Sequence, residues 1–169
     1  MFAEALVLVA LPLLLATAGI FDLASFTIPN FLQAALVACF VAFVFATHLR
    51  VPDIGLHLLA GFIGLAIGFT LFILGYVGGG DAKLFAAVVL WLGFKDLMPY
   101  ALVATLLGGV LTLGLLALRK LPLPALLARQ SWILRLHDSR AGIPYGVALA
   151  AGVFVVLPGT EIFHLAAAM

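Results

Sequence analysis

The chain has 169 residues, of which 66% are hydrophobic and only 9% are charged. A soluble domain carries about a quarter charged residues, so this composition excludes a water-facing surface and predicts helices surrounded by lipid. The net charge of +1 gives no indication of nucleic acid as a partner, and the single cysteine excludes a disulfide within one chain.

Six apolar segments, each bounded by charges, proline or glycine, are candidate membrane helices. They cover residues 2–21, 31–49, 54–75, 82–94, 98–118 and 142–160. The first resembles a signal peptide, but Glu4 stands where a basic region belongs, so we interpret it as a retained span that Pro12 kinks. The fourth is shorter than the roughly 20 residues that cross a bilayer, which places its N-terminal flank at membrane depth. We predict an all-α integral membrane protein, a single domain over residues 1–169 with about six transmembrane helices in one bundle.

The basic residues predict the orientation of this bundle. Six spans place both termini on one side, and the loops on the other side carry most of the lysine and arginine: Lys83, Arg119, Lys120, Arg129, Arg135 and Arg140. The opposite loops carry only Arg50 and Lys95. The positive-inside rule therefore predicts that the loops around 22–30, 75–83 and 119–141 are cytoplasmic and that both termini face outward.

The longest loop, between the fifth and sixth predicted helices, mixes leucines and Trp132 with Arg129, Arg135 and Arg140. A basic amphipathic segment of this kind usually lies on the cytoplasmic leaflet. Membrane lipid is therefore an expected partner.

Two of the seven acidic residues are not explained by solvation in loops or near termini. Asp22 ends the first predicted span and Asp81 opens the fourth, both on the predicted cytoplasmic side. A carboxylate at membrane depth costs up to about 3 kcal/mol, which makes it a functional candidate. Two such groups in one site repel as anions, so one is protonated and the other ionised, as in aspartic proteases. In isolation, Asp22 is explained as a solvated helix end and Asp81 as an acid that complements a helix dipole.

The residues around these acids are candidates for shaping a site. Gly78, Gly79 and Gly80 remove three side chains in a row, which allows unusual backbone angles and an exposed backbone edge for an extended peptide. Pro29 fixes the chain where the second helix begins, and Asn30 is expected to be its N-cap.

Lys83 and Tyr145 are weaker candidates. Lys83 could stabilise an ionised aspartate or the substrate, although a lysine near an interface more often extends to the headgroups. Tyr145 could reach the cleft, although a tyrosine near a helix start usually belongs to the aromatic belt. The four histidines lack ligand spacing, so we predict no metal site and no cofactor.

Three segments together resemble the type IV prepilin peptidase family, the GxGD membrane aspartic proteases. They are the D-x6-PN stretch from Asp22 to Asn30, the GxGDxKL stretch from Gly78 to Leu84, and GIPYGVALA from Gly142 to Ala150. The resemblance implies that Asp22 and Asp81 are the catalytic pair. It also implies an inner-membrane peptidase that cleaves the leader from prepilins or pilin-like precursors, substrates with an N-terminal hydrophobic helix, at the cytoplasmic border.

Larger members of that family carry a further cytoplasmic segment with paired cysteines and methylate the new N-terminus with S-adenosylmethionine. This chain has neither feature. It resembles the small prepilin peptidases of tight-adherence (Flp) pilus systems or the archaeal preflagellin peptidases, and methyltransferase activity is not predicted.

Two other functions fit the same acids. A small proton-coupled transporter would use them to relay protons or bind a cation, whereas a scaffold subunit of a secretion system would tolerate their replacement. The identity of the pilin, the bacterial or archaeal source, the oligomeric state and the separation of the two acids all stay open at the level of sequence.

Overall fold

The computed structural model describes residues 1–124 and 126–168, so residue 125 of the expected amphipathic stretch lies outside the described part. The elements in chain order are α1 Phe2–Ala5, η1 Leu6–Ala10, α2 Leu11–Ser25, α3 Asn30–Thr47, α4 Val51–Ile73, α5 Gly79–Leu118, η2 Leu127–Arg129, α6 Ser131–His137, α7 Tyr145–Val156, η3 Leu157–Gly159 and α8 Glu161–Ala167. Every regular element in these residues is a helix.

Among the described residues, four helices are long and apolar enough to cross a membrane, and a bent pair at the C-terminal end makes up to five. The four are Phe2–Ser25, Asn30–Thr47, Val51–Ile73 and Gly79–Leu118. The bent pair joins Tyr145–Gly159 to Glu161–Ala167 at 55°. The chain is therefore an all-α, multi-pass membrane protein, as its composition predicts.

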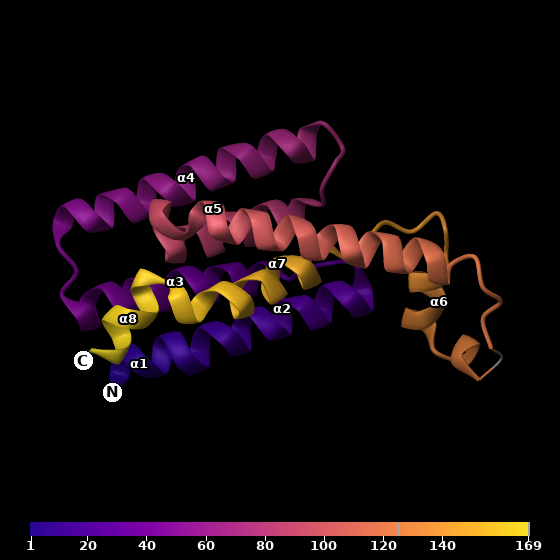
Figure 1. Cartoon of the computed structure of the whole chain (residues 1–169), viewed down its shortest axis with the longest axis horizontal. Coiled ribbons are helices and arrows are strands. Elements are labelled where there is room, and N and C mark those ends of the chain that lie inside the picture. Colours follow the sequence, from indigo (N-terminus) through magenta and orange to yellow (C-terminus); the bar gives the residue numbers. More distant parts are fainter. Residues whose placement is uncertain (125, 169) are drawn as a thin grey trace.

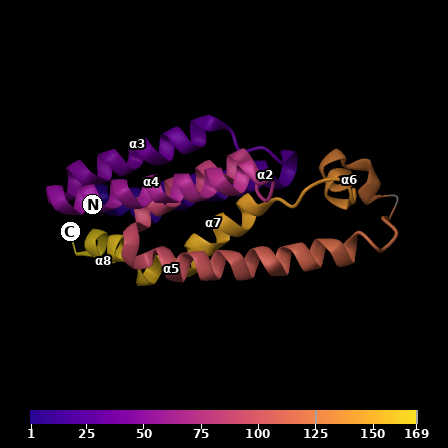
Figure 2. The ribbon, with the colours of Figure 1, turned by 90° about the horizontal axis from the view of Figure 1, so that it is seen from above.

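Helix α5 contains two of the predicted segments. Gly93 interrupts it with φ 67° and ψ −172°, and the rings of Phe85 and Tyr100 stack with their centroids 6.0 Å apart. In a straight helix these two residues would be roughly 22 Å apart, so α5 folds back on itself at Gly93 (Figures 1 and 2). We call residues 79–92 the first arm and residues 94–118 the second arm. They correspond to the predicted fourth and fifth segments.

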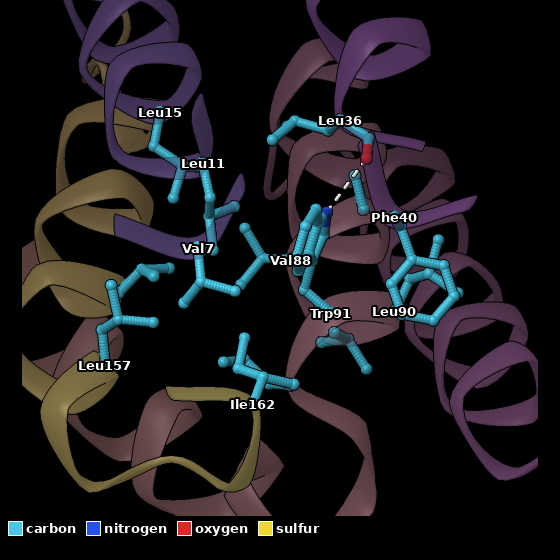
Figure 3. Close-up of a cluster of buried hydrophobic side chains, with 14 of the residues drawn as sticks. Val7, Leu11, Leu15, Leu36, Phe40, Val88, Leu90, Trp91, Leu157 and Ile162 are labelled. Carbon is cyan, nitrogen blue, oxygen red and sulfur yellow. Dashed lines mark hydrogen bonds between the residues drawn. The ribbon is translucent and has the colours of Figure 1, made fainter. Parts of the chain in front are cut away.

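The first arm lies in the centre of the bundle. Its residues from Ala87 to Gly93 are all buried, as expected of a helix that is apolar on every side. Figure 3 shows Val88 and Trp91 between residues of the N-terminal helix, α3 and the C-terminal region. The indole Nε1 of Trp91 donates a 3.0 Å hydrogen bond to the Leu36 carbonyl. Because other helices surround it, this arm can be shorter than a lipid-facing span.

Helix α4 packs against the first arm through a line of small residues. Ala60, Gly64 and Gly68 are its only buried positions, and they recur every four residues on one face. A Cβ on Gly68 would lie 3.0 Å from the backbone of Ala82. Glycine thus permits the close helix contact that membrane proteins use in place of a hydrophobic driving force. Most of the other large apolar side chains of α4, such as Leu58, Phe62 and Phe69, are exposed and fit a lipid environment.

The helix ends differ by a few residues from those of the predicted segments, and the two terminal segments have further departures. The sixth segment begins as helix at Tyr145, three residues later than predicted, and continues beyond residue 160 as α8 to Ala167. At the N-terminus a π-helical turn, η1, lies just before Pro12. Proline lacks an N–H and crowds the preceding turn, and a local π turn is one way in which a membrane helix accommodates it.

The connections divide between the two ends of the bundle. In Figure 1 the α2–α3 and α4–α5 connections and the α6 region lie at one end, whereas both termini, the α3–α4 connection and the fold-back of α5 lie at the other. We call these the loop end and the terminal end. All three loops that the charge pattern groups together therefore share one end of the molecule.

Candidate active site

Asp22 is buried in the last turns of α2. This residue is only 4% exposed, so Asp22 is not a solvated helix end. The helix stops four residues later because Phe26 adopts a left-handed conformation, φ 55° and ψ 28°. The carboxylate Oδ2 of Asp22 accepts a 2.7 Å hydrogen bond from the backbone N–H of Gly146. This bond joins the end of α2 to the first turn of α7.

Asp81 lies in the first turn of α5 and has two different carboxyl oxygens. Its Oδ2 accepts a 3.3 Å hydrogen bond from the N–H of Gly78, the residue that caps the helix. Its Oδ1 is buried and has no hydrogen-bond partner among the described residues. Buried polar atoms are nearly always paired, and leaving one unpaired costs about 1–3 kcal/mol. The helix cap therefore accounts for Oδ2 only. Oδ1 can accept a hydrogen bond from a ligand or water.

Both carboxyl groups lie near the start of α7. They are close enough to interact electrostatically, and the Gly146 backbone lies within range of both. The amide groups at the beginning of a helix carry partial positive charge, which favours an anion there. The fold thus brings together a pair of acids that are far apart in sequence and places them beside a built-in source of positive potential.

Close packing around Ile28 holds the three segments together. A Cβ on Gly80 would lie 3.3 Å from the Cβ of Ile28. A Cβ on Gly146 would lie 2.7 Å from Ile28 Cδ1 and 2.8 Å from Asp22 Oδ2. The absence of a side chain at these two glycines therefore allows α5 and α7 to approach the segment between Asp22 and α3.

The Asn30 prediction is wrong in one respect. Pro29, with φ −60° and ψ 138°, occupies the N-cap position of α3, and Asn30 is the first helical residue. The side chain of Asn30 makes no capping bond; its Oδ1 accepts a 2.9 Å hydrogen bond from Lys83 Nζ. These two predicted site residues therefore connect the start of α3 to the first turns of α5 at the exposed edge of the site.

The glycine run before Asp81 also differs from the prediction. Gly78 has ordinary extended angles, φ −72° and ψ 151°, while Gly79 and Gly80 belong to the first turn of α5. The run therefore offers no free backbone edge to an extended peptide. A Cβ on Gly79 would lie 3.4 Å from the Phe72 ring, and one on Gly78 would lie 3.0 Å from Asp81 Oδ2. These glycines provide space instead of unusual backbone angles.

An apolar groove of about 550 Å³ opens beside Asp81. Its walls come from α4, both arms of α5 and the first turns of α7, and small residues such as Gly68, Ala104 and Gly109 line much of it. Asp81 is the only charged side chain among the described residues that line the groove. Tyr145 lines it as well, and its hydroxyl oxygen lies 3.3 Å from that of Thr112.

A model of the type IV leader peptidase family matches residues 9–113, more than half of the chain, and the match includes both aspartate segments. The chain belongs to the type IV leader peptidase family. The resemblance seen in the sequence is thereby confirmed, and the protein is a peptidase of this general class. The matched range ends before Gly142–Ala150, so the contribution of that segment to the candidate site rests on the contacts of Gly146. Neither the comparison with curated proteins nor that with solved structures gave a match.

Sequence reasoning missed two residues of the candidate site, Gly146 and Ile28. The sequence points to the GIPYG stretch but to Tyr145 alone as its site residue, because a tyrosine carries a visible functional group and a glycine does not. A backbone N–H donor leaves no trace in residue type. The only signal for Ile28 is its position inside the D-x6-PN stretch. A buried apolar side chain is the ordinary expectation there, so this signal does not single it out.

The chain has a second cavity, of about 350 Å³, at the terminal end. Its acids are already neutralised: Asp53 pairs with Arg50 at 2.7 Å and Glu161 pairs with Lys95 at 2.8 Å. Within residues 1–124 and 126–168, no group of three or more histidine, cysteine, aspartate or glutamate side chains is placed to hold a metal ion. The pair of acids at the loop end is therefore the better candidate for chemistry.

Proposed function

We propose that this chain is a membrane aspartic endopeptidase that removes the leader peptide from prepilin or pilin-like precursors. The observation that carries the proposal is that Asp22, bonded to the Gly146 N–H, lies close enough to interact electrostatically with Asp81, whose buried Oδ1 has no partner among the described residues. Membership of the leader peptidase family supports the reaction class. No cofactor takes part in the proposed reaction.

In this reaction the two carboxyl groups share one proton. The ionised carboxylate takes a proton from water, the water oxygen attacks the peptide carbonyl carbon, and the protonated partner donates its proton to the carbonyl oxygen. The carboxyl group that took the water proton then donates it to the leaving nitrogen as the C–N bond breaks, and the other carboxylate takes the proton of one hydroxyl group as the carbonyl re-forms, which restores the shared proton. The unpartnered Oδ1 of Asp81 is suited to hold the water, and the N–H of Gly146 keeps the Asp22 carboxylate in place.

The groove beside Asp81 suits the apolar part of such a substrate. A prepilin has an N-terminal hydrophobic helix, and small wall residues leave room for the bulky side chains of an inserted helix. Exposed residues of α4 and α5, including Ile67 and Gly109, belong to the groove lining. We therefore propose that the substrate helix enters sideways from the lipid, with its leader directed toward the two aspartates.

The charge distribution supports a location in the inner membrane with the aspartates on the cytoplasmic side and both termini outward. The loop end carries Lys83, Arg119, Lys120, Arg129, Arg135 and Arg140, against Arg50 and Lys95 at the terminal end. The positive-inside rule assigns the more basic loops to the cytoplasm, where the leader of a membrane-inserted prepilin would remain.

The first experiment is co-expression with a candidate prepilin, with the precursor-to-mature size shift as the readout. Asp22→Asn and Asp81→Asn should each reduce cleavage at least about 100-fold, because each removes one partner of the acid–base pair. Asp53→Asn is a matched control: Asp53 is the third residue of α4, as Asp81 is of α5, but it pairs with Arg50 at the terminal end.

Both single variants must still be present in the membrane at the level of the wild type. Cleavage that persists in either variant would remove that aspartate from the reaction. A transporter would be favoured if the wild type cleaves none of several prepilins but carries an ion flux that both variants lose. Tolerance of both substitutions in a working secretion system would favour a scaffold.

A further inference from the structure

The region between α5 and α7 forms a basic arm, which we define as residues 119–124 and 126–140. In Figures 1 and 2 it lies beyond the ends of α2 and α4, at the same end of the molecule as the two aspartates. Leu116 and Leu118 are exposed just before it, and Arg119 and Lys120 follow at once. Such a change from apolar to basic residues marks the border between hydrocarbon and headgroups. The basic arm therefore begins at the level of the headgroups.

The cations of the arm differ from those at the other end in their partners. Lys120, Arg129, Arg135 and Arg140 are exposed, and among the described residues none of them forms an ion pair. The only acid of the arm, Asp138, accepts a hydrogen bond from the backbone N–H of Arg140. By contrast, Arg50 and Lys95 at the terminal end each pair with a carboxylate.

Apolar side chains accompany these cations. Leu126 is 74% exposed and Trp132 is 38% exposed, and Leu127 and Leu134 are exposed as well. Leucine and tryptophan beside arginine suit the boundary between acyl chains and headgroups, where each part of the surface finds a matching environment. A purely aqueous partner, such as a soluble polyanion, would match only the charges.

Arg119 fixes the arm to the rest of the molecule. Its Nε donates to the Leu136 carbonyl and its Nη2 donates to the Gly142 carbonyl, each at 2.8 Å. These bonds join the end of α5 to α6 and to the segment that leads into α7. The unpaired cations are therefore presented by a braced element, which is connected through Gly142 to the turn that carries Gly146.

We propose that the basic arm is a docking surface for the anionic phospholipid headgroups of the leaflet at the loop end. The phosphodiester groups supply the negative charge that the arginines lack within the protein, and the leucines and Trp132 enter the outer part of the acyl layer. This surface does not depend on the proposed peptidase activity, so the two can be tested separately.

The test uses the full chain in vesicles that contain phosphatidylcholine and phosphatidylglycerol, with a brominated acyl chain on one lipid at a time. Bromine quenches tryptophan fluorescence at short range, and subtraction of the Trp132→Phe spectrum isolates Trp132 from Trp91. We expect stronger quenching by brominated phosphatidylglycerol than by brominated phosphatidylcholine. The double variant R129Q/R135Q should lose this preference, by about five-fold for each arginine removed.

Two further variants control for charge and folding. R50Q/K95Q removes the same number of positive charges at the terminal end and should keep the preference. R129K/R135K keeps the charges and should keep most of the preference.

Equal quenching by the two lipids in the wild type would overturn the proposal and point to a protein partner. An equal loss of the preference in R50Q/K95Q would also overturn it, because net charge alone would then explain the effect. The proposal would also be overturned if inorganic phosphate abolished the preference and chloride at equal ionic strength did not. That result would identify a site for soluble phosphate.

Discussion

Gly146 is the residue at which the separate parts of the candidate site meet. Its N–H binds Asp22, its backbone lies in range of Asp81, and its missing side chain leaves space for Ile28. Only glycine combines these features, because any Cβ would overlap both a carboxylate oxygen and a methyl group. We therefore regard Gly146 as a positioning residue that holds the Asp22 carboxylate in place.

Gly146→Ala should lower both stability and activity, since overpacking typically costs 1–3 kcal/mol. The double variant Gly146→Ala with Ile28→Val separates the two effects. Valine lacks the Cδ1 atom that a new Cβ would meet at 2.7 Å, whereas the contact with Asp22 Oδ2 remains. We expect the double variant to regain most of its thermal stability but to cleave prepilin at least about 100-fold more slowly than Ile28→Val alone.

A double variant that cleaves at the rate of Ile28→Val would show that the position of the Asp22 carboxylate does not depend on Gly146. An unstable double variant would show that Ile28 is not the main steric obstacle. Both quantities are measured on the same purified samples.

The elements of the fold depend on the reversal of α5 at Gly93. With φ 67° and ψ −172°, Gly93 occupies a backbone region that is essentially restricted to glycine. A Cβ there would also lie 3.1 Å from the His57 ring. The reversal keeps the first arm central and brings the second arm alongside the groove, so a local backbone requirement at the terminal end shapes the wall of a site at the loop end.

Gly93→Ala should reduce the free energy of unfolding by about 1–3 kcal/mol. Gly114→Ala is the matched control, since Gly114 belongs to the same helix and a Cβ there would meet nothing within 4 Å. This control should be neutral or slightly stabilising, because alanine has the higher helix propensity. Denaturant unfolding in micelles measures both; equal effects would contradict the special role of Gly93.

The groove makes a separate prediction about the second arm. Gly109 lines it, and a Cβ at this position would meet nothing within 4 Å. Gly109→Leu should therefore fold normally and fill part of the groove, so the KM for prepilin should rise at least about ten-fold with little change in kcat. Gly114→Leu, which lies outside the groove lining, is the control. Unchanged kinetics in Gly109→Leu would exclude this groove as the path of the substrate helix.

The whole molecule has one basic loop end and one weakly acidic terminal end. Unpaired cations gather at the loop end, whereas Arg50 and Lys95 are paired at the other. The candidate acids, the basic arm and the groove beside Asp81 all belong to the loop end or open near it. This arrangement predicts that one side of the membrane carries all of the chemistry.

Cysteine labelling tests the orientation. In a Cys39→Ser background, Val51→Cys at the terminal end and Ser139→Cys on the basic arm are both exposed positions. A membrane-impermeant thiol reagent should label Val51→Cys in intact cells, and should label Ser139→Cys only after the membrane is permeabilised. The reverse pattern would place the aspartates outside and would contradict the proposed cytoplasmic cleavage.

The sequence by itself determined the membrane environment, the approximate helices, the grouping of the basic loops and the two acids. Each of these follows from residue type and local order: lipid demands long apolar helices, and an acid at their border stands out. The helix starts were less accurate, as Pro29 and Asn30 illustrate, because neighbouring residues can exchange the capping position at little cost.

Only the tertiary structure decided how these parts meet. Contacts between segments far apart in the chain determine the bond from the Gly146 N–H to Asp22 and the bond between Lys83 and Asn30. They also determine the close approach of Gly80 to Ile28 and the reversal at Gly93. A backbone donor and a missing side chain have no chemical signature in a sequence. They acquire a role when packing brings another residue to within a few ångströms.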